Sequence, residues 1–124
     1  MALTDGGGGK NLRASRGEVW LAQLGSARDG ELGKNRPVVV LSIDKIATGE
    51  PDELVIVVPV TSSPRSGGFK ISLGEGERLS VPSVALSRSI RAIARSRLLE
   101  PLGRVSELTL FDLTSQVAYL IGHE

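Results

Sequence analysis

The sequence predicts a small, mainly β domain (α+β) in which short strands form a barrel-like antiparallel sheet and one amphipathic helix ends the chain. Two observations favour this fold class. Short apolar and β-branched runs recur between Gly, Pro and Asp residues, which is typical of a small barrel or sandwich. Apolar side chains repeat at helical spacing in a single segment near the C-terminus. The length of 124 residues fits one core better than two.

Residues 1–15 are predicted to form a flexible N-terminal arm. They contain four consecutive glycines, Gly6 to Gly9, and almost no large apolar side chain. Ordering such a segment costs backbone entropy with little burial in return. Residues 16–124 are therefore expected to form the single folded domain.

The expected strands follow one another from residue 18 onward. The runs at 38–43 and 54–61 are continuously apolar and suit strands that are buried on both faces. Pro59 cannot donate to a ladder, so it should lie at an edge, at a bulge or where regular pairing ends. The complete set of predicted strands is 18–24, 38–43, 54–61, 69–73, 83–87, 89–94 and 98–105.

The C-terminal segment is predicted to be a helix capped by Ser106. One stripe should face the core, and it consists of Leu110, Leu113, Val117, Leu120 and Ile121. Gly122 follows the last apolar residue and is expected to end the helix. Among the aromatic residues, Trp20 and Phe111 are expected in the core, and Phe69 is expected to be exposed.

Composition excludes several kinds of chemistry. The chain has no Cys and a single His, His123, so it lacks the parts of a thiolate zinc site, a cysteine nucleophile or a His-rich metal centre. No apolar run is long enough to span a membrane, and the N-terminus has no signal-peptide core. We therefore expect a cytoplasmic protein that binds no metal.

Charge is distributed unevenly although the net charge is only +1. Residues 54–74 and 78–99 contain no acidic side chain. They carry seven cationic residues, namely Arg65, Lys70, Arg78, Arg88, Arg91, Arg95 and Arg97. Most charge runs are simply solvated, but an acid-free stretch of this length favours contact with a polyanion.

Arg36 and Thr61 are a candidate phosphate-binding pair. Arg36 precedes Pro37, which holds it in extended geometry at the start of one apolar strand, and Thr61 ends the next. If these strands are antiparallel neighbours, the two side chains lie opposite each other. A guanidinium beside a hydroxyl can bind a phosphate, although most arginines and strand-end threonines have no such role.

The order of these motifs resembles the MazF/PemK family of toxin/antitoxin ribonucleases. The resemblance rests on RGEVW at 16–20, NRPVVVLS at 35–42, PVTSS at 59–63 and IRAIARSRL at 90–98. It implies a barrel related to the SH3-like and CcdB types, a homodimer, and cleavage of single-stranded RNA without a metal or other cofactor. It also implies that Arg36 and Thr61 are catalytic. The products implied are a 2′,3′-cyclic phosphate and a 5′-hydroxyl.

Further residues are expected to contact the RNA. The resemblance places Glu31, Lys34 and Asn35 in the loop before the catalytic arginine. The complete set of candidate RNA-binding residues is Glu31, Lys34, Asn35, Ser62, Arg65, Lys70, Ser83, Arg88, Ser89 and Arg91. A cognate antitoxin is expected to lay an extended acidic segment across the basic groove of 65–97.

Two other functions remain open at this stage. A related barrel toxin of the CcdB type poisons DNA gyrase and has no ribonuclease activity, so Arg36 and Thr61 would then be irrelevant to catalysis. A non-catalytic interaction module would bind RNA or a partner and leave the RNA intact. Both remain open because a fold does not determine a function.

Overall fold

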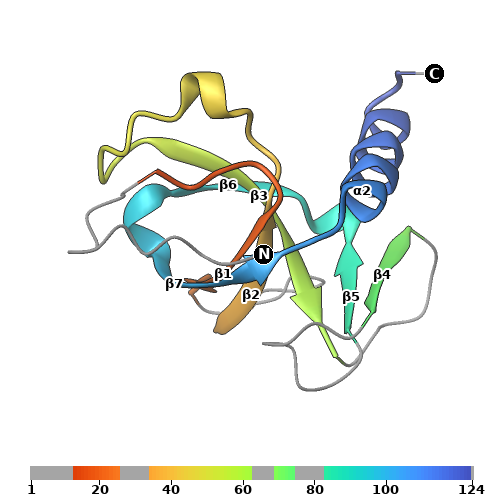
Figure 1. The fold of residues 1–124 in the computed structure, drawn as a ribbon, viewed down its shortest axis with the longest axis horizontal. Coiled ribbons are helices and arrows are strands. Elements are labelled where there is room, and N and C mark those ends of the chain that lie inside the picture. Colours follow the sequence, from red (N-terminus) through yellow and green to blue (C-terminus); the bar gives the residue numbers. More distant parts are fainter. Residues whose placement is uncertain (1–12, 26–33, 63–68, 75–82, 124) are drawn as a thin grey trace.

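The computed structural model describes residues 13–25, 34–62, 69–74 and 83–123. These residues form seven strands and a C-terminal helix (Figure 1). The strands are β1 (Glu18–Gln23), β2 (Asn35–Val40), β3 (Leu54–Thr61), β4 (Lys70–Gly74), β5 (Ser83–Leu86), β6 (Arg91–Ala94) and β7 (Leu98–Arg104). The helix is α2 (Glu107–Leu120), and the single 3-10 turns are η1 (Asp44–Ile46), η2 (Ser87–Ser89) and η3 (Arg95–Arg97). Each predicted strand is found, with boundaries shifted by a few residues.

The seven-stranded sheet is antiparallel throughout, with the order β4-β5-β3-β2-β1-β7 and with β6 paired to β3. The predicted fold class, a mainly β domain with one C-terminal helix, is confirmed, and in the described residues the barrel-like sheet does not close. Strand β3 has two different partners along one of its edges. Its first half pairs with β6, through Leu54 to Val57, and its end pairs with β5, through Val60 and Thr61.

Pro59 lies in the gap between these two paired segments of β3. The missing N–H of proline is tolerated where regular pairing stops, as the sequence predicted. Pro59 is fully buried. The residue therefore marks the position at which one edge of β3 changes partner from β6 to β5.

The sheet buries apolar side chains on both of its faces. Because successive side chains of a strand point to opposite faces, Val38 and Val40 of β2 enter one core and Val39 enters the other. The first core also contains Trp20 and Ala22 of β1. The second core is covered by α2. The continuous apolar runs predicted for β2 and β3 are thus explained by burial on both sides.

Helix α2 begins at Ser106, whose side chain accepts a hydrogen bond of 3.1 Å from the Thr109 N–H. Leu113 and Val117 are buried against the second core, but Ile121 is 76% exposed. The expectation that Phe111 is a core residue was wrong, since its side chain is 66% exposed. The helix covers one face of an open sheet, so only a narrow stripe of it is buried. No helix in the described segments is long and apolar enough to span a bilayer.

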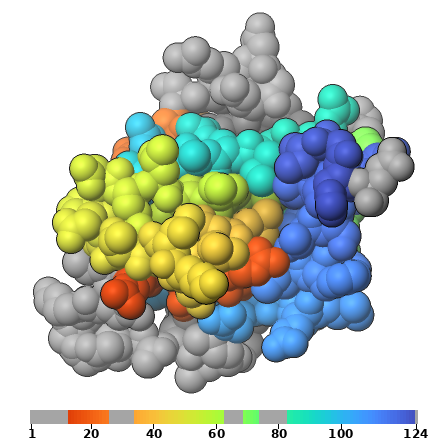
Figure 2. Space-filling view, turned by 90° about the horizontal axis from the view of Figure 1, so that it is seen from above, coloured from red at the N-terminus to blue at the C-terminus, as the bar shows by residue number. Residues whose placement is uncertain are grey.

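The segment before β1 fastens the helix to the sheet. The Arg16 guanidinium donates to Leu41 O and to Thr114 Oγ1, each at 2.7 Å, and the Arg16 N–H donates to the Asp44 carboxylate. In Figure 2 the orange residues of this segment lie between the yellow η1 region and the blue helix. Ala14 is 4% exposed and packs in the first core, so the packed domain begins within the stretch that the sequence assigned to the arm.

Candidate functional site

Arg36 and Thr61 lie at the same end of the sheet on neighbouring strands. The register of β2 and β3 pairs Val38 with Pro59 and Val39 with Val58. Continued by two residues, this register sets Arg36 opposite Thr61. Side chains alternate along a strand, so Arg36 lies on the face of Val38, and Thr61 on the same face. The fold thus brings together the two residues that the sequence paired.

The two side chains differ in their burial. Thr61 is 5% exposed and is held between strands, since it also pairs with Val84 of β5. Arg36 is half-buried at the second position of β2, where Pro37 restricts it to extended backbone. A buried hydroxyl beside a partly exposed guanidinium can hold an anionic oxygen on the solvent side of the sheet end. The planar fork of arginine suits a phosphate, which it can hold through two parallel hydrogen bonds.

The backbone that leads into Arg36 has an unusual conformation. Lys34 has a φ of 66°, a left-handed conformation that is uncommon outside glycine. Its carbonyl accepts a 2.9 Å hydrogen bond from the Leu24 N–H, and its own N–H donates to Gly25 O, where φ is 83°. Such strain costs on the order of 1–3 kcal/mol and clusters at functional sites. It fixes the direction in which Asn35 and Arg36 leave the loop.

Three further candidates share this end of the sheet. Asn35 is exposed and pairs with Gln23 of β1. Ser62 follows Thr61 and is exposed, and Ser83 begins β5 one residue before the Val84 that pairs with Thr61. The sheet end therefore gathers Lys34, Asn35, Arg36, Thr61, Ser62 and Ser83.

Other predicted RNA-binding residues lie in a second region. Arg91 pairs with Val57, four residues before Thr61, which is about 13 Å along an extended strand. Arg88 and Ser89 belong to η2, and Lys70 pairs with Leu86 just before it. The fold thus sets Arg91 away from the Arg36–Thr61 end, while η2 with Arg88 and Ser89 lies next to β3. Glu31 and Arg65 lie outside the described residues.

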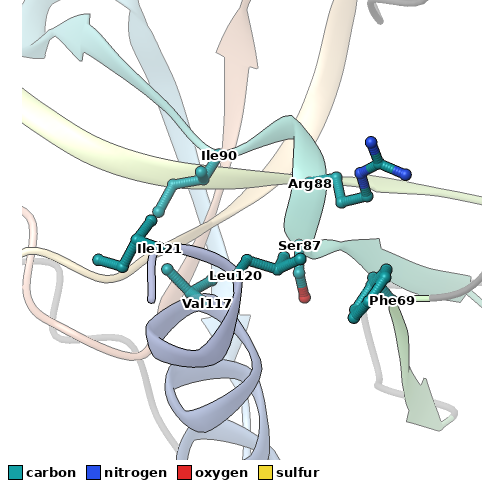
Figure 3. A pocket seen from close by; sticks show the side chains of 7 residues that line it. All are labelled: Phe69, Ser87, Arg88, Ile90, Val117, Leu120 and Ile121. Carbon is teal, nitrogen blue, oxygen red and sulfur yellow. The ribbon is translucent and has the colours of Figure 1, made fainter. Parts of the chain in front are cut away.

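This second region contains a pocket of about 520 Å³ that the sequence did not indicate. Figure 3 shows Ile90 and Ser87 beside the last turn of α2 and Phe69 next to Ser87, while the Arg88 side chain points away from the helix. Phe69 stacks against Tyr119 with ring centres 6.4 Å apart and is half-buried, less exposed than expected. The pocket is lined by Phe69, Ser87, Arg88, Ile90, Val117, Leu120 and Ile121.

The arginines of the acid-free segment 78–99 have different environments in the fold. Arg95 is 7% exposed, and its guanidinium carbon lies 5.0 Å from the centre of the Trp20 ring. Burial lowers the pKa of Arg95, while the Glu53 and Glu18 carboxylates oppose that shift. Arg95 therefore belongs to the packing of the domain. Arg97, two residues later, is exposed.

The described residues include no group of three or more His, Cys, Asp or Glu side chains placed to hold a metal ion. The described charged residues next to Thr61 at this end, Lys34 and Arg36, are cationic. The chemistry available there is phosphate binding by a guanidinium, a hydroxyl and neighbouring polar groups.

Comparison with known proteins identifies the family. Residues 15–121 match the family described as PemK-like, MazF-like toxin of type II toxin-antitoxin system. The chain is 40% identical over 103 residues to Endoribonuclease MazF9 of Mycobacterium tuberculosis, an alignment that covers 79% of this chain and 87% of that protein.

Solved structures show the same fold. The crystal structure of MazF from Deinococcus radiodurans superposes with a TM-score of 0.75 at 24% identity, covering 89% of this chain and 97% of that one. A MazE-MazF crystal structure from the same organism gives a TM-score of 0.66 at 26% identity, covering 90% and 98%. With a family match over most of its length, the chain belongs to the PemK/MazF family of toxins of type II toxin-antitoxin systems.

Proposed function

We propose that this MazF-like endoribonuclease cleaves single-stranded RNA, including mRNA, by attack of a ribose 2′-hydroxyl on the adjacent 3′-phosphate. The 2′-oxygen gives its proton to solvent and forms a bond to phosphorus, the bond from phosphorus to the 5′-oxygen breaks, and the 5′-oxygen takes up a proton. The products are a 2′,3′-cyclic phosphate and a 5′-hydroxyl. The observation that supports this proposal is the register of β2 and β3, which sets Arg36 opposite Thr61 when it is continued by two residues.

The two side chains have different roles in the proposed reaction. Negative charge grows on the phosphoryl oxygens as the 2′-oxygen attacks, and the Arg36 guanidinium stabilises that charge. Because a guanidinium has N–H donors and no acceptor, Arg36 acts as a hydrogen-bond donor to the leaving 5′-oxygen and not as the base. The Thr61 hydroxyl holds the 2′-hydroxyl or a phosphate oxygen in line. This route needs neither a metal nor a cofactor.

The residues around the pair bind the RNA on both sides of the cleaved bond. Lys34 and Asn35 lie just before and at the start of β2, Ser62 follows the end of β3, and Ser83 begins β5. Lys70, Arg88, Ser89 and Arg91 contact nucleotides farther along the RNA, and Arg91 lies about 13 Å from Thr61 by the strand spacing. Glu31 and Arg65 complete the proposed set from the sequence.

We further propose that the toxin acts in the cytoplasm as a homodimer and is inhibited by an antitoxin. The solved MazE-MazF structures from Deinococcus radiodurans support such a partner. The antitoxin binds through an extended acidic segment across the basic surface of 65–97, where it competes with RNA. If the antitoxin bound equally well when RNA saturated the protein, this competitive scheme would be wrong.

The test is cleavage of one long RNA by the purified protein, with every cut site mapped and the end groups identified. Cyclic phosphate and 5′-hydroxyl ends, full activity in EDTA, and loss of cleavage when the scissile nucleotide carries 2′-deoxyribose are expected. A deoxy substrate that is cut at the normal rate refutes the mechanism. Intact RNA under all conditions refutes the ribonuclease activity.

The gyrase-poisoning alternative is not favoured, because the family match and the relatives above are MazF-type proteins. The same assay distinguishes the two functions, since it contains no gyrase. A protein that leaves RNA intact but inhibits DNA supercoiling by gyrase would have the alternative function.

A further inference from the structure

We propose that Arg97 binds a phosphate of the RNA next to the one held by Arg36, so that the cationic surface of Lys34 and Arg36 continues across β1 to the start of β7. This inference rests on the ribonuclease function proposed above. Of the cationic residues in the acid-free segments of the sequence, it assigns Arg97 to the site, and other arginines of those segments lie elsewhere in the fold.

Strand pairing brings Arg97 to the Arg36 end of the sheet. Ala22 of β1 pairs with Arg36 on one side and with Leu98 on the other. Neighbouring strands are about 4.8 Å apart, so the Cα atoms of Arg36 and Leu98 are separated by about 10 Å across β1. Arg97 immediately precedes Leu98. Two arginine side chains at this separation can contact neighbouring phosphates of one strand.

Arg97 is held in place by the end of β1. The pairing of β7 with β1 reaches Leu98 and Ala22 but not the next residue, Gln23. The Arg97 Nη1 group donates a 3.2 Å hydrogen bond to Gln23 O and so takes the position of a missing ladder partner. The same nitrogen lies beside Gly25, at the base of the loop that leads to Lys34. The residue is exposed, so the rest of its guanidinium is accessible to a ligand.

Charged residues of both signs lie near Arg97. Lys34 and Arg36 lie on the far side of β1, and the described acids nearby are Glu100, which pairs with Leu21 farther from this end, and Asp52 and Glu53, whose segment accepts backbone hydrogen bonds from Arg95 and Ser96. The two cations lie on the side of Arg97 that faces the Arg36 end of the sheet. Other arginines of the acid-free segments are placed elsewhere: Arg95 stacks on Trp20, Arg88 lines the pocket beside α2, and Arg91 pairs with Val57.

The test measures how RNA affinity depends on salt. The probe is a short single-stranded RNA that carries a mapped cut site with 2′-deoxyribose at the scissile nucleotide. Fluorescence anisotropy gives its Kd from 50 mM to 1 M KCl. Each neutralised phosphate contributes about 0.7 to the slope of log K against log salt for single strands. If the wild-type and variant plots of log K against log salt meet at 1 M, loss of one phosphate contact corresponds to about eightfold weaker RNA binding at 50 mM.

Arg104→Gln is the matched control for Arg97→Gln. Arg104 is also an exposed arginine of the β7 region, and its Nη1 donates to a backbone carbonyl, Arg16 O, at the opposite end of β1. Both variants change the net charge equally. Arg97→Gln should lower the slope by about 0.7, whereas Arg104→Gln should match the wild type, and Arg97→Lys should keep most of the slope because it keeps the charge.

The outcomes distinguish this inference from the proposed function. If wild-type protein cleaves RNA but Arg97→Gln and Arg104→Gln have equal slopes, Arg97 binds no phosphate and the ribonuclease function stands. If Arg97→Gln slows cleavage at saturating RNA without a change in slope, Arg97 only positions the loop, and the inference fails. If Arg97→Gln changes antitoxin affinity alone, the residue serves the protein partner. Wild-type protein that neither binds nor cleaves RNA overturns both proposals. Circular dichroism and thermal unfolding verify that each variant is folded.

Discussion

A double-mutant cycle on Arg36 and Thr61 tests whether the two residues act on one phosphate. The changes are Arg36→Gln, Thr61→Val and both together. The first removes the guanidinium, and the second removes a hydroxyl at nearly constant shape. Because the strand register sets the residues opposite each other, their effects on the cleavage rate should be strongly coupled.

The expected sizes follow from the geometry. A unit charge about 4 Å from a phosphate at a protein surface contributes about 4 kcal/mol at an effective dielectric constant near 20. Lost oxyanion donors cost about 2.7–4 kcal/mol, so Arg36→Gln should slow cleavage by about 10²–10³-fold. Thr61 is 5% exposed, and a hydrogen bond to a charged group contributes about 1.5–3 kcal/mol. Thr61→Val should therefore slow cleavage by roughly 10–150-fold. Arg36→Lys keeps the charge without the planar fork and should lie between wild type and Arg36→Gln.

The assay is single-turnover cleavage of an RNA that carries the mapped site. Thr114→Val is the matched control for Thr61→Val. The Thr114 hydroxyl also lies close to an arginine, since it accepts a 2.7 Å hydrogen bond from Arg16 Nη2. Arg104→Gln controls for loss of a positive charge. Both controls should cleave at the wild-type rate. Circular dichroism should show every variant folded.

The result that refutes the shared site is additivity. Independent residues give effects that add within about 0.3–0.5 kcal/mol, whereas residues that act as a unit give a double variant little worse than the poorer single one. Wild-type cleavage by Arg36→Gln or by Thr61→Val would remove that residue from the chemistry. A Thr61→Val protein that loses stability but keeps its rate would show that the hydroxyl is only structural.

The remaining predictions concern stability, and thermal or urea unfolding checks each of them. Leu113→Ala should lower the free energy of unfolding by about 2–5 kcal/mol, because this fully buried side chain holds α2 on the sheet; an effect below 1 kcal/mol would contradict that packing. Glu53 has its pKa lowered by hydrogen bonds, first that from the Thr48 N–H, against the effect of burial. The stabilisation by Glu53 is therefore present above the ordinary pKa of a glutamate and is lost as pH falls through the lowered value. Glu53→Gln should then lower the free energy of unfolding by about 0.5–1 kcal/mol at pH 7 and by nothing at pH 2–3. An equal penalty at both pH values would exclude the Glu53 carboxylate as the source of this stabilisation. Deletion of residues 1–12 should leave the melting temperature unchanged, whereas deletion through residue 15 should lower it because Ala14 leaves the core, and equal effects would contradict that assignment.

Strand positions were largely readable from the sequence, because they depend on local residue types. The runs that became β2 and β3 are β-branched and apolar on both faces, and the fold buries both faces. The pairing of Arg36 with Thr61 could be predicted for the same reason, since it needs only that two consecutive buried strands are antiparallel neighbours. That the barrel-like sheet stays open was not readable from these runs, because the change of partner along β3 from β6 to β5 depends on pairings between distant segments.

The local pattern of the chain thus determined the strands, the capped helix, the strand-end pair and, through its motifs, the family. Tertiary structure alone decided which side chains are buried and which are exposed, where the sequence pattern does not distinguish them. Arg95 and Arg97 are the same residue type two positions apart, yet one is buried on Trp20 and the other is exposed beside Gln23. Burial depends on which distant segments of the chain pack against a residue. The sequence pattern shows charge and periodicity, but it does not specify those tertiary contacts.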